Sequence, residues 1–327
     1  MTLWIGRRAS IGVASEALRG VGAAPTYWIN PLSFSFADVP ERAISDASFG
    51  GIWGGDQSLK VLEKAEGDIE MEVDDRSFGV FLRSVFGAVS PATIDTSAYK
   101  HTYTISNTNQ HTSMTLTVDD PIGQLQFELS MIDTLEMSFV ANQIVKSKVK
   151  FISKGSQDTS LNTPSFSTAT KKFVGRHLQF KVADVTANLA AASAVSLLSL
   201  NLRFEKNAEA QSTLSTVQPE DVVNKKFAIT GDFTLNYEDR TWLNYVKNGT
   251  YRAIRINLIH DDLAGAATQK YEFLLDLSKC AIESFDPDFS MDDVVKQKFN
   301  FTALYDAGGN NNVVNNCYLV NKVTTYA

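Results

Sequence analysis

The sequence has little cysteine, and its pattern excludes several site types. Only Cys280 and Cys317 occur among 327 residues, and no CxxC spacing is present. Neither a disulfide framework nor a zinc module is therefore supported. Two isolated thiols fit folding in a reducing cytoplasm.

Catalytic and cofactor motifs are also lacking. The four histidines form no HExxH or other ligand spacing, and no P-loop, GxGxxG or GxSxG is present. Residues 286–297 have early calcium-loop oxygens, but Met291 stands where the turn glycine belongs and Gln297 where the bidentate Glu belongs. We expect no bound metal, no cofactor and no enzymatic activity, which favours a structural role for the protein.

Charge and hydropathy restrict the partners. Thirty basic and 37 acidic residues give a net charge of −7. That balance argues against tight, sequence-blind nucleic-acid binding, but not against a surface that nucleic acid passes without sticking. The N-terminus lacks the apolar core of a signal peptide. The most apolar later run, residues 189–200, is too short to span a bilayer.

One sequence pattern occurs twice in the chain. GDIEMEVDDRSFGVFLRSVFG at 67–87 matches GDFTLNYEDRTWLNYVKNG at 231–249, with an offset of 231 − 67 = 164. In each copy apolar residues first alternate with polar ones, as in a half-buried strand. Acidic residues suited to a helix N-terminus follow. Each helix then carries an apolar stripe and ends near a glycine. The predicted helix-packing residues are Phe78, Phe81, Leu82, Trp242, Tyr245 and Val246.

Two further matches keep the same order. Residues 144–151 resemble 294–301, and residues 32–36 resemble 198–202 more weakly. We interpret the three matches as a tandem duplication, the alternative being chance resemblance between amphipathic segments.

The duplication predicts two domains. The first covers 1–155, with an N-terminal arm (1–30) and a long loop (37–56); the second covers 173–327 and includes a C-terminal arm. Residues 156–172, rich in Ser and Thr, form the predicted linker. Strands follow one another without alternating helices, so the expected fold is mainly β with short helices. Each domain is expected to be a sandwich or barrel with one flanking α-helix.

Two groups of residues stand out on this frame. Asp68, Glu70 and Glu72 share one strand face, and the second copy places Asp232, Thr234 and Asn236 there. The face is either an ordinary solvated surface or a wall that repels polyanions. Lysines at 146, 148 and 150 could pair with the acids and weaken that repulsion.

The second group is apolar. Phe49, Ile52 and Trp53 lie in the Gly-rich loop. They either await a partner surface or fold back on their own domain.

The N-terminal quarter resembles a known family. Gly12–Glu16, Gly22–Pro25, Ile29–Phe36 and Lys64–Ile69, leading to the Phe78–Phe86 helix and Gly87, resemble the start of tail tube proteins of long-tailed, siphophage-type bacteriophages. The resemblance covers residues 5–90 and is diffuse beyond them.

The resemblance implies a β-sandwich that assembles into stacked rings, forming the tube that conducts the genome. Since six such domains usually surround the lumen, two per chain imply a homotrimer with pseudo-sixfold symmetry. The two strand faces then become lumen candidates. Phe49, Ile52 and Trp53, with the N-terminal arm, become ring-to-ring contacts.

The implied partners are other copies of the chain, the tape measure protein, transient double-stranded DNA, and the terminator and distal tail proteins, without a membrane. The implied location is the virion tail, after a stage in the host cytoplasm. Two alternatives stay open: another ring-forming tail component, such as a terminator or hub, and a tandem β-sandwich module or enzyme for carbohydrate.

Overall fold

The protein has a mainly β fold. The computed structural model describes residues 5–326 except 267 and 293. In this part of the chain two α-helices accompany antiparallel strands, α1 (Phe78–Phe86) and α2 (Thr241–Asn248). Short 3₁₀ helices occur at η1 (Gly6–Arg8), η2 (Gly175–His177) and η3 (Thr186–Asn188). The mainly β prediction with short helices is confirmed.

The strands divide between the two halves of the sequence. Those of the first half are β1 (Ser10–Ser15), β2 (Tyr27–Ile29), β3 (Pro31–Phe34), β4 (Ala37–Ile44), β5 (Ser58–Glu72), β6 (Gly87–Asp95), β7 (Ala98–Ile105), β8 (Met114–Asp119), β9 (Gln124–Val140), β10 (Lys146–Lys154) and β11 (Gln157–Asp158). Those of the second half are β12 (Leu178–Ala183), β13 (Ala194–Val195), β14 (Ser199–Glu205), β15 (Glu209–Gln211), β16 (Asp221–Val223), β17 (Ala228–Asn236), β18 (Arg252–Leu263), β19 (Lys270–Ile282), β20 (Asp286–Asp288), β21 (Lys296–Leu304) and β22 (Val314–Asn321).

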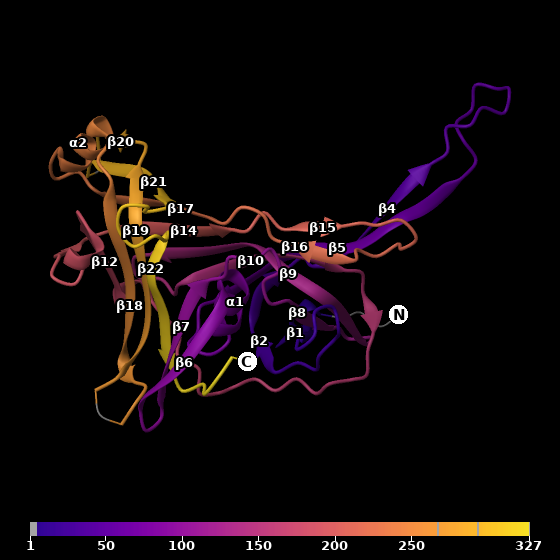
Figure 1. Ribbon diagram of the computed structural model, residues 1–327, viewed down its shortest axis with the longest axis horizontal. Helices are drawn as coiled ribbons and strands as arrows, with labels where there is room; N and C mark the ends of the chain where they lie inside the picture. The colour runs from indigo at the N-terminus through magenta and orange to yellow at the C-terminus, as the bar shows by residue number, and fades with distance from the viewer. Residues whose placement is uncertain (1–4, 267, 293, 327) are drawn as a thin grey trace.

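One sheet, which we call the long sheet, runs through both halves. Its order is β3, β5, β10, β9, β14, β17, β21 and β20, each antiparallel to its neighbour. The junction between the halves is the pairing of β9 with β14. Figure 1 shows this sheet as a band across the top of the molecule, with α1 beneath it.

A second layer lies below the long sheet. In the first half β1 pairs with β2 and β8, and β8 pairs with the first part of β9. In the second half β12 pairs with β13 and β18, and β18 with β19. β22 joins β19 to the β6–β7 hairpin. Because β9 is long, its first part lies in the lower layer and its last part in the long sheet.

Strand register repeats between the halves at the offsets seen in the sequence. The equivalent pairs in the long sheet are Phe34–Ile69 with Leu200–Phe233, Gly67–Phe151 with Gly231–Phe301, and Lys148–Glu136 with Lys298–Asp286. The differences are 166 for β3/β14, 164 for β5/β17 and 150 for both β10/β21 and the β9/β19–β20 segments. Each of the three sequence matches therefore lies on equivalently paired strands.

The lower layer repeats as well, although no match between its strands is visible in the sequence. The equivalent pairs are Val13–Leu116 with Val182–Ile254, and Ile11–Ile29 with Phe180–Val195. β8 and β18 differ by 254 − 116 = 138, compared with 164 just before the helices. The first half therefore has 164 − 138 = 26 additional residues there, which hold the β6–β7 hairpin.

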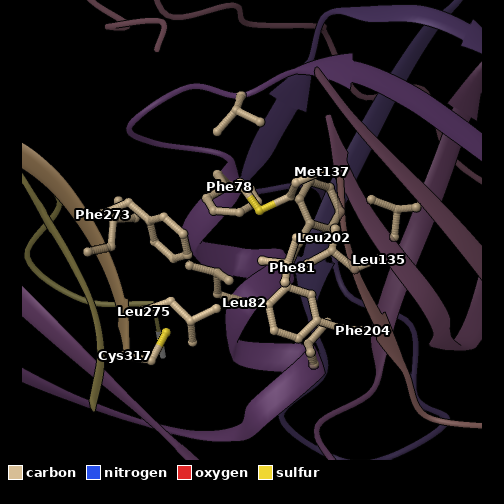
Figure 2. Close-up of a cluster of buried hydrophobic side chains, with 14 of the residues drawn as sticks. Phe78, Phe81, Leu82, Leu135, Met137, Leu202, Phe204, Phe273, Leu275 and Cys317 are labelled. Atoms are coloured by element: carbon tan, nitrogen blue, oxygen red, sulfur yellow. The ribbon is translucent and has the colours of Figure 1, made fainter. Parts of the chain in front are cut away.

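The hydrophobic core is shared by both halves. Figure 2 shows α1 between side chains of the long sheet, including Met137 and Leu202, and side chains of the second half's lower layer, including Phe273 and Cys317. Phe78 packs edge-on against Phe273, with ring centroids 5.5 Å apart. Side chains of the two predicted domains therefore pack against each other in one core. The division into domains 1–155 and 173–327 stays a prediction.

Three predicted irregular segments are strands. Residues 10–15 of the expected N-terminal arm form β1, with Ile11 and Val13 in the core. Small residues on both faces hid this strand, because period-two alternation disappears when both faces are buried. Residues 37–44 of the expected loop form β4, which is polar because it lies in an exposed hairpin with β5. The expected C-terminal arm contains β22, paired on both edges.

Candidate functional surface

The outer face of the long sheet is polar and hollowed. A concavity of about 750 Å³ is lined by residues of β5, β9, β10, β14, β17, β21 and the turn after β19. Its lining includes Glu70, Glu136, Lys148, Arg203, Asp232 and Asn300. We call this surface the polar face. It crosses the β9–β14 junction, so it is built from both halves.

Strand alternation places the predicted face residues. On β5, Asp68, Glu70 and Glu72 are partly exposed, while Ile69 and Met71 between them are buried. On β17, Asp232, Thr234 and Asn236 are likewise outside, over a buried Phe233 and Leu235. The structure brings Glu70 and Asp232 onto the same concavity. Whether this face lines a lumen stays a prediction.

The acidic row is electrically compensated. Lys148 Nζ lies 2.9 Å from Asp68 Oδ2, and Lys146 Nζ lies 3.7 Å from Glu70 Oε1. The hydrogen bond to Asp68 raises the pKa of Lys148. Lys172, from the segment between the halves, pairs with Glu72. Each exposed pair contributes little stability, but together they cancel local charge.

The pairing continues across the rest of the face. Further ion pairs are Lys150–Asp133 at 3.1 Å, Arg203–Glu136 at 3.3 Å and Lys298–Asp232 at 3.2 Å. The cross-strand lysines suggested by the sequence therefore turn the acidic row into a checkerboard of both signs. A uniformly acidic wall does not describe this surface.

The β4–β5 hairpin forms an arm that projects from one end of the molecule (Figure 1). Phe49, Ile52 and Trp53 lie at its tip with 65%, 97% and 76% of their surface exposed. They do not fold back on their own chain. Their assignment as ring-to-ring contacts stays a prediction.

The two helices differ in their cover. Phe78, Phe81 and Leu82 of α1 are fully buried. On α2, Trp242, Tyr245 and Val246 pack against the core but keep partial exposure, and the ring centroid of Trp242 lies 5.1 Å from that of Phe233. α2 therefore occupies the position of α1 without the covering layer that α1 receives from the second half.

Sequence reasoning missed the ends of the long sheet. The β3–β4 segment and β20 each pair on one side in the structure. Phe289, next to β20, is 62% exposed, and Met291 is almost fully exposed. Edge strands cannot be recognised from one sequence, because the edge is defined by the partner that is missing. The sequence offered at most a hint, Phe289 standing among polar residues in a strand-like segment.

The described residues contain no group of three His, Cys, Asp or Glu side chains positioned to hold a metal ion. His101 is buried and bonds to Asn321 and the carbonyl of Val323, and its burial lowers its pKa. Cys280 and Cys317 are buried free thiols, and burial raises their pKa values. Asp286 and Asp288 belong to a strand. His101, Cys280 and Cys317 thus lie in the interior, and the two aspartates lie on an edge strand of the long sheet.

Comparison with known protein families identifies the family of this chain. A family model described as phage tail tube protein matches residues 6–303, which is most of the chain. The chain belongs to that family, whose members are structural components of the virion tail. A search of curated proteins found no match. Within the described residues, no helix has the length and apolarity needed to cross a bilayer.

Proposed function

We propose that this phage tail tube protein forms rings in which two equivalent halves per chain enclose a channel, with the polar face as the channel wall. The repeated strand register is the observation that carries the proposal, because it makes one chain two successive segments of the same wall. The concavity of the polar face, lined by strands of both halves, supports this choice of wall.

Three copies complete such a ring. Six tube domains around a lumen are what the resemblance to the family implies, and each chain supplies two. The ring is then a trimer with pseudo-sixfold symmetry, closed by a head-to-tail contact between copies. Stacked trimers build the tube, and the tape measure protein, followed by the genome, occupies its channel. Terminator and distal tail proteins contact the two ends.

The passage of DNA along this wall is physical and not chemical. A bound phosphate gains affinity when clustered Lys and Arg displace its condensed counterions. On the polar face, lysines are engaged by carboxylates, as for Lys148 with Asp68 and Lys298 with Asp232. A neutral checkerboard therefore neither retains the duplex nor repels it strongly.

Ring stacking is assigned to the arm. Its tip exposes an aliphatic and two aromatic side chains, Phe49, Ile52 and Trp53. Exposed apolar groups on a projecting hairpin fit burial against another ring, because isolated patches of this kind mark interaction sites.

Electron microscopy of the concentrated protein tests the proposal. The wild type is expected to form hollow tubes, whereas Phe49→Ser/Trp53→Ser is expected to give rings that do not stack. Ile122→Ser is the matched control, since Ile122 is 87% exposed in the β8–β9 turn, outside the arm. Isolated monomers throughout, together with absence from purified tails, would refute the proposal. A stoichiometry of one ring per particle would instead indicate a terminator or hub.

A further inference from the structure

We propose that the two free edges of the long sheet pair with each other between neighbouring copies, in the register of the internal β9–β14 junction. Residues 33–39 of one copy are placed antiparallel to residues 284–290 of the next. This inference rests on the proposed self-assembly and specifies its contact. Figure 1 shows β20 near one end of the molecule and the β4–β5 hairpin, which continues the β3 edge, projecting from the other end, as a head-to-tail contact requires.

The internal junction supplies the template. β9 and β14 pair continuously from Val140–Ser199 to Thr134–Glu205. At this junction the first half ends its part of the long sheet and the second half begins its own. At the two outer edges of the sheet the same two roles recur. The segment containing β20 in the second half is equivalent to the last part of β9, and β3 with the start of β4 in the first half is equivalent to β14.

The offsets translate the template into a register. Adding 150 to β9 gives residues 284–290, and subtracting 166 from β14 gives residues 33–39; both offsets come from observed strand pairs. The expected pairs between copies are Ser33–Ser290, Phe34–Phe289, Ser35–Asp288 and Ala37–Asp286.

Exposure at the edges agrees with this register. Phe139 and Leu200 face each other at the internal junction and are fully buried. Their counterparts are Phe289, which is 62% exposed, and Phe34, which is half-buried. Pairing between copies would bury both aromatic rings. Pro287 gives its edge strand one N–H donor fewer, which limits uncontrolled pairing.

The hairpin that follows β14 provides a second, independent observation. β15 and β16 lie over β10 and β9 of the first half, where Ala210 packs against a cluster that includes Met131 and Ile152. The arm has the same register, since Ile44 pairs with Ser58 as Ala210 pairs with Val222. The arm is thus the first half's version of this crossing hairpin.

Side-chain sizes at this second contact are exchanged. Under the same offsets, Ala210 corresponds to Ile44, Met131 to Ala281 and Ile152 to Thr302. Ile44 is exposed in the isolated chain, while Ala281 and Thr302 are half-buried. A large residue on the arm therefore meets small residues on the neighbour, whereas inside the chain a small residue meets large ones. Such compensation preserves packed volume.

Disulfide trapping tests the register. Ser33→Cys/Ser290→Cys, treated with copper phenanthroline as oxidant, is expected to give a non-reducing gel ladder that ends at one closed ring size. Ser33→Cys/Ser284→Cys is the slipped control; its thiols would lie about 20 Å apart in this register and should not crosslink. Ser138→Cys/Asn201→Cys should crosslink within one chain and give no ladder, because these residues are opposite at the internal junction.

The outcomes separate this inference from the proposed function. Tubes without a ladder would overturn the edge pairing and leave tube formation standing. A ladder without tubes would support the pairing and contradict the tube. A ladder of equal yield from the slipped control would overturn the register.

The exchanged sizes give a second test. Ile44→Ala is expected to weaken self-association by about tenfold, because it removes a side chain that is buried at the contact. Ala281→Met in the same chain recreates the internal arrangement of Ala210 with Met131, and should restore most of the loss. Analytical ultracentrifugation measures both variants. Equal loss in the single and double variants would contradict the proposed contact.

Discussion

At the scale of single residues, the region where strand β5 turns into α1 holds a buried carboxyl group. Asp75 is 1% exposed, and its Oδ1 accepts the N–H of Lys171 at 2.6 Å. Its backbone carbonyl accepts hydrogen bonds from Asn321 and Tyr326 near the C-terminus. Burial raises the pKa of Asp75 to about 6 from 3.8. One residue thus ties three distant segments together at the cost of desolvating an acid.

This raised pKa predicts a pH dependence of stability. The folded state binds the Asp75 proton more tightly than the unfolded state, so stability falls as pH rises from about 4 to about 6. The fall is at most about 3 kcal/mol, since each pKa unit corresponds to about 1.4 kcal/mol. Asp75→Asn keeps the oxygen that accepts the Lys171 N–H and should remove this fall.

Urea unfolding of the unassembled protein between pH 4 and pH 7 measures the effect. Asp120→Asn is the control, because Asp120 accepts backbone N–H groups in an exposed turn. The control should keep the wild-type slope. An unchanged slope in Asp75→Asn would show that the carboxyl does not titrate in this range.

At the scale of elements, the repeat depends on two glycines at equivalent register. Gly67 lies opposite Phe151, and Gly231 lies opposite Phe301. A Cβ on Gly231 would lie 2.5 Å from the carbonyl oxygen of Asn201, and one on Gly67 would lie 2.4 Å from the Cα of Phe36. Both neighbours are backbone atoms of the adjacent segment, β14 at Asn201 and the short link between β3 and β4 at Phe36. The glycines therefore allow close strand approach beside a crossing phenylalanine.

Alanine at Gly231 is expected to destabilise the fold by about 2 kcal/mol or more, because the adjacent strand must shift. Gly123→Ala is the matched control, since a Cβ at Gly123 would point into open space among the described residues. That control should change stability by less than about 0.5 kcal/mol. Thermal unfolding of both variants checks the prediction, and equal midpoints would contradict it.

The same elements show how far sequence reasoning reaches. Alternation followed by a helical stripe predicted both strand–helix units, since β5 and β17 each bury one face. β1 stayed hidden because it is buried on both faces, and the likeness of β8 to β18 was masked by the inserted β6–β7 hairpin. The polar face was predictable from its period of two. The lysines at 146, 148 and 150 also indicated that the acids could be paired, although their exact partners depend on the strand register. The free edges were not predictable, because an edge is defined by contacts between strands that lie far apart in the sequence.

At the scale of the whole molecule, the polar face balances its charges by pairing strands of opposite sign. β5 contributes three acids and β10 three lysines, held side by side by a continuous antiparallel register. This surface is therefore closer to neutral than the net charge of −7 for the whole chain suggests. If this face is the proposed channel wall, local charge balance on it, more than the overall acidity of the chain, determines how strongly it attracts a phosphate backbone.

Removing the three acids should expose the lysines. Asp68→Asn/Glu70→Gln/Glu72→Gln leaves Lys146, Lys148 and Lys172 without their carboxylate partners and changes the net charge from −7 to −7 + 3 = −4. We expect this variant to bind duplex DNA at low salt, with log K falling against log salt at a slope of about −2 to −3 for three freed lysines. Fluorescence anisotropy of the unassembled protein measures the binding.

The control Asp46→Asn/Asp56→Asn/Glu220→Gln makes the same change in net charge at exposed positions outside the polar face, and should not bind. Equal binding by both variants would mean that net charge alone, rather than the compensated face, keeps DNA from adhering.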